Sequence, residues 1–99
     1  MQNFRTFQLA KQLLEASKTV QLKEPYRSRF NRAVLSIPLN LAEGSAKMSN
    51  KERRKFYEIA LGSLRETQVI IDVMELTNLK EIADRTGANL YKLCLTLRH

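Results

Sequence analysis

The chain has 99 residues, of which 43% are hydrophobic and 27% are charged, and it contains a single cysteine. This length suits one domain, and the apolar fraction is too high for a disordered chain. One cysteine excludes an internal disulfide framework, and no apolar run approaches the roughly 18 residues of a membrane span. We therefore expect a soluble, cytoplasmic protein with no membrane partner.

The charge balance is strongly basic. Seventeen Lys and Arg residues against ten Asp and Glu residues give a net charge of +7. A basic protein of this size favours an anionic partner such as nucleic acid. The alternative is that the charge serves only solubility.

The first two predicted elements are helices. Apolar residues recur at three- and four-residue steps from Phe4 to Val20, which predicts a helix over about residues 3–20. Pro25 suits the first turn of a second helix, over about residues 25–46, because its missing N–H is not needed there. Pro38 lies inside this second helix, and we expect a kink there because the apolar periodicity continues beyond it. Two shorter helices divided at Pro38 are the alternative.

A third helix is predicted over about residues 50–76, after a capping box formed by Ser49 and Glu52. The inward stripe of this helix is expected to comprise Phe56, Ile59, Ala60, Ser63, Thr67, Ile70 and Met74. Further apolar residues spread around most of the helix beyond this stripe, which indicates that a partner subunit covers part of it.

Apolar residues from Leu79 to Leu97 predict a fourth helix over about residues 79–98. No segment alternates with period two, so no strand is expected. Because the connections are only a few residues long, consecutive helices should be antiparallel neighbours. The expected fold is all-α, a single domain over residues 1–99 that forms an up-down-up-down antiparallel four-helix bundle with a kink near Pro38.

Residues with catalytic or metal-binding chemistry are scarce. The one histidine is His99, and Cys94, between two leucines, fits a small core residue better than a nucleophile. No spacing of His, Cys or carboxylate residues matches a zinc or di-iron site, and no glycine-rich phosphate loop occurs. We therefore expect no catalytic residues, no metal and no cofactor.

Polar residues interrupt the second helix around its proline. They recur at helical steps and form a stripe that can simply face water. Their position beside Pro38 and a glycine equally favours a structural role, in which Asn40 and Glu43 satisfy backbone groups freed by Pro38 or by the following turn. The predicted structural motif comprises Ser36, Pro38, Asn40, Glu43 and Gly44.

Two blocks of sequence carry a resemblance to a known family. The first is Ser36-Ile37-Pro38 followed by Asn40-Leu41-Ala42-Glu43-Gly44, and the second runs from Glu58 to Glu66, just after Phe56. With these blocks the chain resembles the 23S rRNA intervening-sequence proteins, which are encoded within insertions in bacterial large-subunit ribosomal RNA genes and also elsewhere in genomes. The resemblance implies a four-helix bundle and a ring-like homopentamer. It also implies similarity to the accessory protein of the reverse transcriptase of diversity-generating retroelements, which binds nucleic acid.

Small residues in the middle of the third helix favour a close contact with another helix. A glycine in a helix interior costs about 1 kcal/mol relative to alanine, so Gly62 is expected to have a packing role. Leu61 beside it interrupts an otherwise polar stripe. We therefore predict an oligomer interface at Leu61, Gly62 and Ser63, in a homo-oligomer for which the resemblance implies five subunits.

Basic residues concentrate at the predicted turn between the second and third helices. In an antiparallel bundle this turn lies at the same end as both termini. A basic helix N-terminus with free N–H groups suits phosphate, although a solvated run of charge is the alternative. The predicted nucleic-acid-binding rim comprises Lys47, Lys51, Arg53, Arg54 and Lys55, with Arg5 and Arg98 as weaker contributors.

Two functional hypotheses follow. The first is a non-enzymatic oligomer that binds the backbone of RNA or DNA through the basic rim, without reading bases, because the neighbouring Phe56 and Tyr57 should be partly buried. The second is a protein-interaction scaffold or accessory subunit, for example of a reverse transcriptase, whose charge is incidental.

Overall fold

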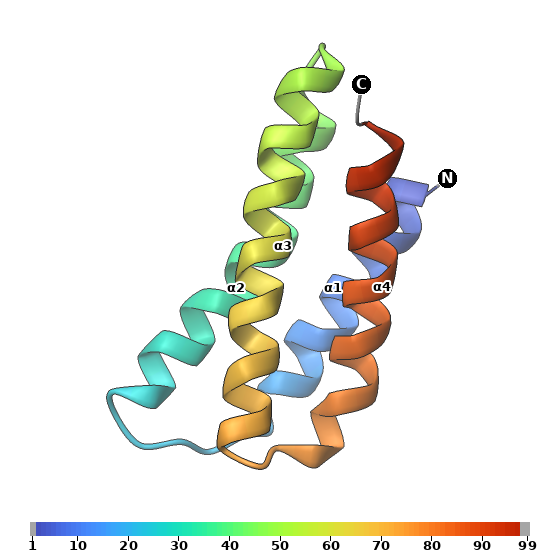
Figure 1. Ribbon diagram of the computed structural model, residues 1–99. Coiled ribbons are helices and arrows are strands. Elements are labelled where there is room, and N and C mark those ends of the chain that lie inside the picture. Colours follow the sequence, from blue (N-terminus) through green and yellow to red (C-terminus); the bar gives the residue numbers. More distant parts are fainter. Residues whose placement is uncertain (1, 98–99) are drawn as a thin grey trace.

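Four helices make up the computed structural model, which describes residues 2–97, and the predicted all-α bundle is confirmed (Figure 1). The helices are α1 (Gln2–Ser17), α2 (Tyr26–Ser45), α3 (Asn50–Val73) and α4 (Lys80–Thr96), and a short 3₁₀ turn, η1 (Thr77–Leu79), precedes α4. The bundle measures 40 × 22 × 19 Å. Among the described helices, none combines the length and the apolar character needed to cross a bilayer.

The helices are arranged as the corners of a square. Each helix packs against two others, in the order α1, α2, α3, α4 and back to α1, so that α1 and α3 lie on a diagonal. The α2–α3 interface is the most extensive of the four, and the α1–α2 interface is the sparsest. The seam between α1 and α2 is therefore the most open side of the bundle.

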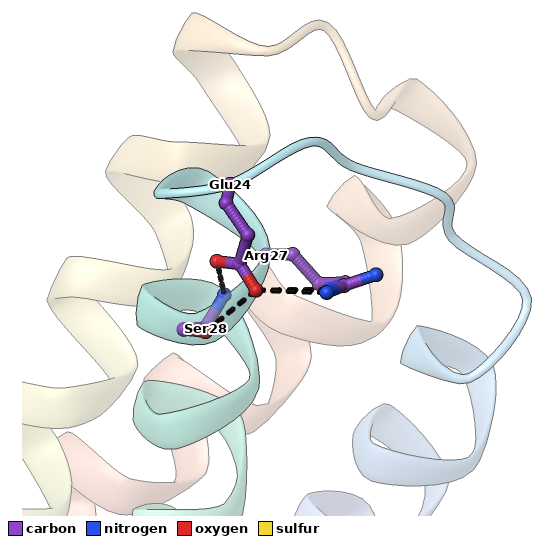
Figure 2. A network of polar contacts seen from close by, with 3 residues as sticks. All are labelled: Glu24, Arg27 and Ser28. Atoms are coloured by element: carbon purple, nitrogen blue, oxygen red, sulfur yellow. Dashed lines mark hydrogen bonds and ion pairs between the residues drawn. The ribbon is translucent and has the colours of Figure 1, made fainter.

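The beginning of α2 is held by Glu24 and not by the proline that follows it. Pro25 is the residue before the helix and has no side-chain oxygen, which corrects the prediction that it lies in the first helical turn. The Glu24 carboxylate accepts hydrogen bonds from the Ser28 N–H at 3.0 Å, the Ser28 hydroxyl at 2.8 Å and Arg27 Nε at 3.1 Å (Figure 2). These bonds, those from Ser28 first and that from Arg27 after them, lower the pKa of Glu24 below its ordinary value.

Helix α2 continues without interruption through Pro38, so the alternative of two shorter helices is wrong. The proline leaves the carbonyl of Val34 without its helical donor. In Figure 1 the first half of α2 leans away from α3, whereas the second half runs beside it, which is the change of direction that we expected.

Helix α1 ends at Ser17, three residues before the predicted end. Side chains near its C-terminus bond to carbonyls of the last turn: Ser17 Oγ donates to Leu14 O at 2.6 Å, and Thr19 Oγ1 donates to Ala16 O at 2.9 Å. Val20 still packs against the core after the helix has ended. Its place in the apolar periodicity therefore extended the predicted helix too far.

Helix α3 ends at Val73, also three residues early, in a Schellman motif. Glu75 adopts the left-handed conformation with φ of 57°, the Leu76 N–H donates to Ile71 O at 2.9 Å, and the Glu75 N–H donates to Asp72 O at 3.3 Å. Glycine usually occupies this left-handed position, because other residues meet a steric penalty there. A glutamate in this place leaves no recognisable stop signal in the sequence.

The buried face of α3 is turned by about one residue from the predicted stripe. Ala60 and Thr67 are buried as expected, but Ile59 is exposed and Ser63 is half-buried. The neighbours α2 and α4 together decide which of several apolar faces points inward. The buried residues of α3 are Tyr57, Ala60, Leu64, Thr67 and Ile71.

Candidate functional site

The turn between α2 and α3 forms the end of the molecule that projects farthest. In Figure 1 this turn extends beyond the start of α1 and the end of α4. Met48, in the turn, is 91% exposed. We call Lys47, Lys51, Arg53, Arg54 and Lys55, which surround this turn, the basic tip.

Helix α3 begins within the basic tip. The Ser49 hydroxyl oxygen accepts a hydrogen bond from the Glu52 N–H at 3.1 Å, which confirms the predicted cap. In return, Glu52 Oε1 accepts a hydrogen bond from the Ser49 hydroxyl at 3.3 Å. Glu52 is the acidic residue in the first turn, where a negative charge is favourable.

Two members of the basic tip also hold the turn together. Arg53 Nε donates to the Lys47 backbone carbonyl at 2.8 Å, and thereby satisfies an acceptor just after the end of α2. The ammonium of Lys47 lies 3.2 Å from Glu43 Oε2 and 5.2 Å from the centre of the Phe56 ring. Both cations therefore have partners within the chain.

The remaining three members are less engaged. Arg54 Nε lies 3.9 Å from Glu58 Oε2, at the outer limit of an ion pair. Lys51 and Lys55 are exposed, and neither forms an ion pair within residues 2–97. The uncompensated charge of the basic tip is therefore concentrated on these two lysines.

The two weaker contributors are separate from the basic tip. Arg5 is exposed near the start of α1, which begins below the projecting turn (Figure 1). Arg98 lies outside the described residues, as does His99. The structure thus brings together the five residues around the turn and leaves Arg5 set back from them.

The predicted structural motif forms a polar contact between α2 and α3. Asn40 Nδ2 donates to both Ser36 O and Ser36 Oγ, each at 2.9 Å, and Ser63 Oγ donates to Ser36 Oγ at 2.8 Å. Asn40 thus bonds to Ser36 and not to the Val34 carbonyl that Pro38 frees. Ser63 contacts α2 of its own chain, which was not apparent from the sequence.

Gly44 allows α2 and α3 to approach closely. A Cβ atom at Gly44 would lie 2.7 Å from Cε1 and 2.9 Å from Cδ1 of Tyr57. The Tyr57 ring is buried, and its hydroxyl lies 3.1 Å from Ser45 Oγ. This contact was not predicted from the sequence. Tyr57 lies one position from the predicted stripe, and residue spacing does not indicate that its ring packs against Gly44.

The predicted interface residues point in different directions. Leu61 packs against the core and Ser63 faces α2, whereas Gly62 is exposed, with no atom within 4 Å of the place where its Cβ would be. Only Gly62 of the three is therefore placed on the outer face of α3.

Among residues 2–97, no group of three or more His, Cys, Asp and Glu side chains is arranged to hold a metal ion. Cys94 is buried.

The comparisons with known proteins agree with the resemblance seen in the sequence. The family model described as 23S rRNA-intervening sequence protein matches residues 2–99. No curated protein and no solved structure gives a significant match to the chain.

Proposed function

The chain belongs to the 23S rRNA-intervening sequence protein family, and from this premise we propose that it is a non-enzymatic, self-associating protein that binds the phosphate backbone of RNA or DNA through the basic tip. The family's description names a gene location and not an activity, so the proposal rests on the chemistry of the surface.

The observation that carries the proposal is the uncompensated charge of Lys51 and Lys55 on the projecting end of the bundle. Lys51 lies in the first turn of α3, where the helix dipole is positive and a cation costs about 0.3–1 kcal/mol at low salt, and Lys55 lies one turn farther along. A bound phosphate would remove this cost and accept hydrogen bonds from the lysines.

The aromatic residues near the basic tip favour recognition of the backbone over recognition of bases. Tyr57 is buried with its hydroxyl next to Ser45, and Phe56 is half-buried under the ammonium of Lys47. Neither ring is free to stack on a base, which is how proteins commonly read single strands. Binding should therefore depend little on sequence and strongly on salt.

The test replaces the two unpaired lysines together, as Lys51→Glu with Lys55→Glu. The matched control is Lys23→Glu with Arg85→Glu, which makes the same charge change at exposed residues away from the turn. Affinity for structured RNA, single strands and duplex DNA is measured across a salt series. Loss of two phosphate contacts should flatten the slope of log affinity against log salt by about 1.8 for duplexes and about 1.4 for single strands.

The expected result is a large loss of affinity in the tip variant and a small one in the control. Arg53 is left unchanged because its bond to the Lys47 carbonyl holds the turn. If the unmodified protein does not bind at low salt, or if both variants weaken binding equally, the basic tip is not the site. The scaffold hypothesis would then take its place.

A further inference from the structure

A polar cleft opens between the first half of α2, which leans away from α3, and the side of α3 that faces it (Figure 1). Its volume is about 530 Å³, and we call it the α2–α3 cleft. Arg29, Arg32 and Ser36 of α2 line one wall, and Ser63 and Glu66 of α3 line the other. The two sequence blocks that carry the family resemblance meet here, since Ser36 begins the first and Ser63 and Glu66 belong to the second.

Arg32 carries the excess charge of the α2–α3 cleft. Arg29 and Glu66 neutralise each other, because Arg29 Nε lies 2.6 Å from Glu66 Oε2. Arg32 is exposed and forms no ion pair within residues 2–97. The side chains that line the cleft therefore leave one positive charge uncompensated.

Ser36 adds a hydrogen-bond donor to this charge. Its hydroxyl oxygen accepts from Asn40 Nδ2 at 2.9 Å and from Ser63 Oγ at 2.8 Å, so both lone pairs are used. The hydroxyl proton has no acceptor in the part of the chain that the structure describes. Arg32 lies four residues earlier, on the same face of α2. A cation and a free hydroxyl proton one helical turn apart suit an anionic oxygen.

The α2–α3 cleft and the basic tip lie along the same side of the molecule. Lys51, Lys55, Gly62 and Glu66 are separated by four, seven and four residues and therefore fall on one line of α3. Gly62 leaves the surface open between the two lysines and the cleft. From Lys51 to Glu66 the line covers 15 residue steps, or about 22 Å of helix.

The carboxylates along this side are neutralised within the chain. Three of them lie between the tip and the cleft, each beside a cation at 3.2, 3.9 and 2.6 Å: Glu43 with Lys47, Glu58 with Arg54 and Glu66 with Arg29. The unpaired cations are at the two ends, Lys51 and Lys55 at one and Arg32 at the other. A ligand with phosphates at both ends therefore fits the charge of this side.

We propose that the α2–α3 cleft holds a second phosphate group of the same nucleic-acid strand whose backbone the basic tip binds. Arg32 is the cationic contact, and the Ser36 hydroxyl donates a hydrogen bond. The strand then follows the outer side of α2 and α3 for about 22 Å instead of touching the tip alone. The described lining of the cleft includes no aromatic ring, so this contact adds affinity and direction without reading bases. The inference rests on the proposed function and gives the course of its ligand.

The experiment compares Arg32→Glu with Arg85→Glu. The control makes the same change at an exposed arginine of α4, which does not pack against α2 within the described residues. Affinity for single strands of three and of twelve thymidylates is measured across a salt series. At about 3.4 Å per stacked nucleotide, twelve rise about 40 Å and reach both sites, whereas three rise about 10 Å and reach one. Folding is checked by circular dichroism.

Arg32→Glu should lower the affinity for the twelve-nucleotide strand by at least about tenfold and flatten its salt slope by about 0.7, because one charged contact is lost. The affinity for the three-nucleotide strand should fall by about half at most, because this strand still binds to the basic tip. Arg85→Glu should weaken both only slightly. Equal losses for the two lengths, or a loss in Arg85→Glu as large as in Arg32→Glu, would overturn the proposal.

Failure of the cleft and failure of the basic tip give different results. Binding that is weakened by Lys51→Glu with Lys55→Glu but not by Arg32→Glu overturns the cleft alone, whereas an unmodified protein that binds neither strand overturns both. If Arg32→Glu does not fold, Arg32→Gln, which removes the charge without reversing it, takes its place. Inorganic phosphate tests the other source of the same chemistry. If it shifts the Arg32 Nε–H resonance saturably and the twelve-nucleotide strand does not, the cleft binds a free ion and the proposal is wrong.

Discussion

Replacement of Gly44 by alanine should destabilise the protein, because the added methyl group meets a buried ring. The new Cβ would lie 2.7 and 2.9 Å from two carbons of Tyr57 and 3.1 Å from the Cβ of Phe56. Overpacking of this kind costs about 1–3 kcal/mol, and the better helix propensity of alanine returns at most about 1 kcal/mol. With the full propensity gain the net loss is up to about 2 kcal/mol, which corresponds to a fall in Tm of up to about 15 °C in a domain of this size.

Gly62→Ala is the matched control, because nothing lies within 4 Å of its new methyl group. This substitution should gain about 0.5–1 kcal/mol from helix propensity alone. Both variants are measured at the same protein concentration, so that any self-association enters the comparison equally. Thermal and urea unfolding are followed by circular dichroism.

A third variant tests the cause. If Tyr57 is first replaced by leucine, which lacks the ring, the cost of Gly44→Ala should shrink, and a double-mutant cycle measures this coupling. The reasoning is refuted if Gly44→Ala melts at or above the temperature of Gly62→Ala, or if the cost is unchanged without the ring.

Three further predictions concern local contacts. Asn40→Ala should lower the free energy of unfolding in urea by about 1 kcal/mol, and Asn40→Asp should lower it more, because a carboxylate cannot donate to Ser36 O. Equal stability of Asn40→Asp and the unmodified protein would contradict this. Glu75→Gly should raise Tm by relieving a left-handed glutamate that costs about 1 kcal/mol, whereas Glu75→Ala should not. Because the pKa of Glu24 is lowered on folding, its stabilising contribution is present above its ordinary value of 4.5 and is lost as the pH falls through the folded value. Glu24→Gln should therefore melt below the unmodified protein at neutral pH and match it in strong acid, and a difference independent of pH would count against the capping role.

The four helices could be predicted because each carries an apolar periodicity that only a helix aligns on one face. Two of their ends could not. At the end of α1, Ser17 Oγ bonds to Leu14 O, a contact that serine and threonine also make inside helices and that therefore gives no stop signal. Glu75 ends α3 in a conformation that the sequence marks only when the residue is glycine or asparagine. The inward face of α3 also depends on two neighbouring helices, so periodicity along α3 alone left it one residue out of place.

The contacts of the candidate site could also be predicted only in part. The concentration of basic residues around the turn is visible in the sequence, but their partners depend on how the turn closes. Arg53 bonds to a backbone carbonyl six residues earlier, and Ser63 reaches Ser36 across 27 residues. A sequence pattern reports residue spacing along one helix, and it does not report which side chains meet between two helices.

The order of the helices around the square has a consequence for biosynthesis. Helix α1 packs against α4 more extensively than against α2, and Thr86 Oγ1 reaches Leu9 O at 3.4 Å across 77 residues. During translation α2 and α3 can pair as soon as both have left the ribosome, because their contacts are local. Helix α1 emerges before them and can pair with α2, but the larger of its two interfaces forms only when α4 has been made. The bundle is thus completed by the joining of its earliest and latest helices, and a nascent chain without α4 exposes an apolar helix face to chaperones and to aggregation.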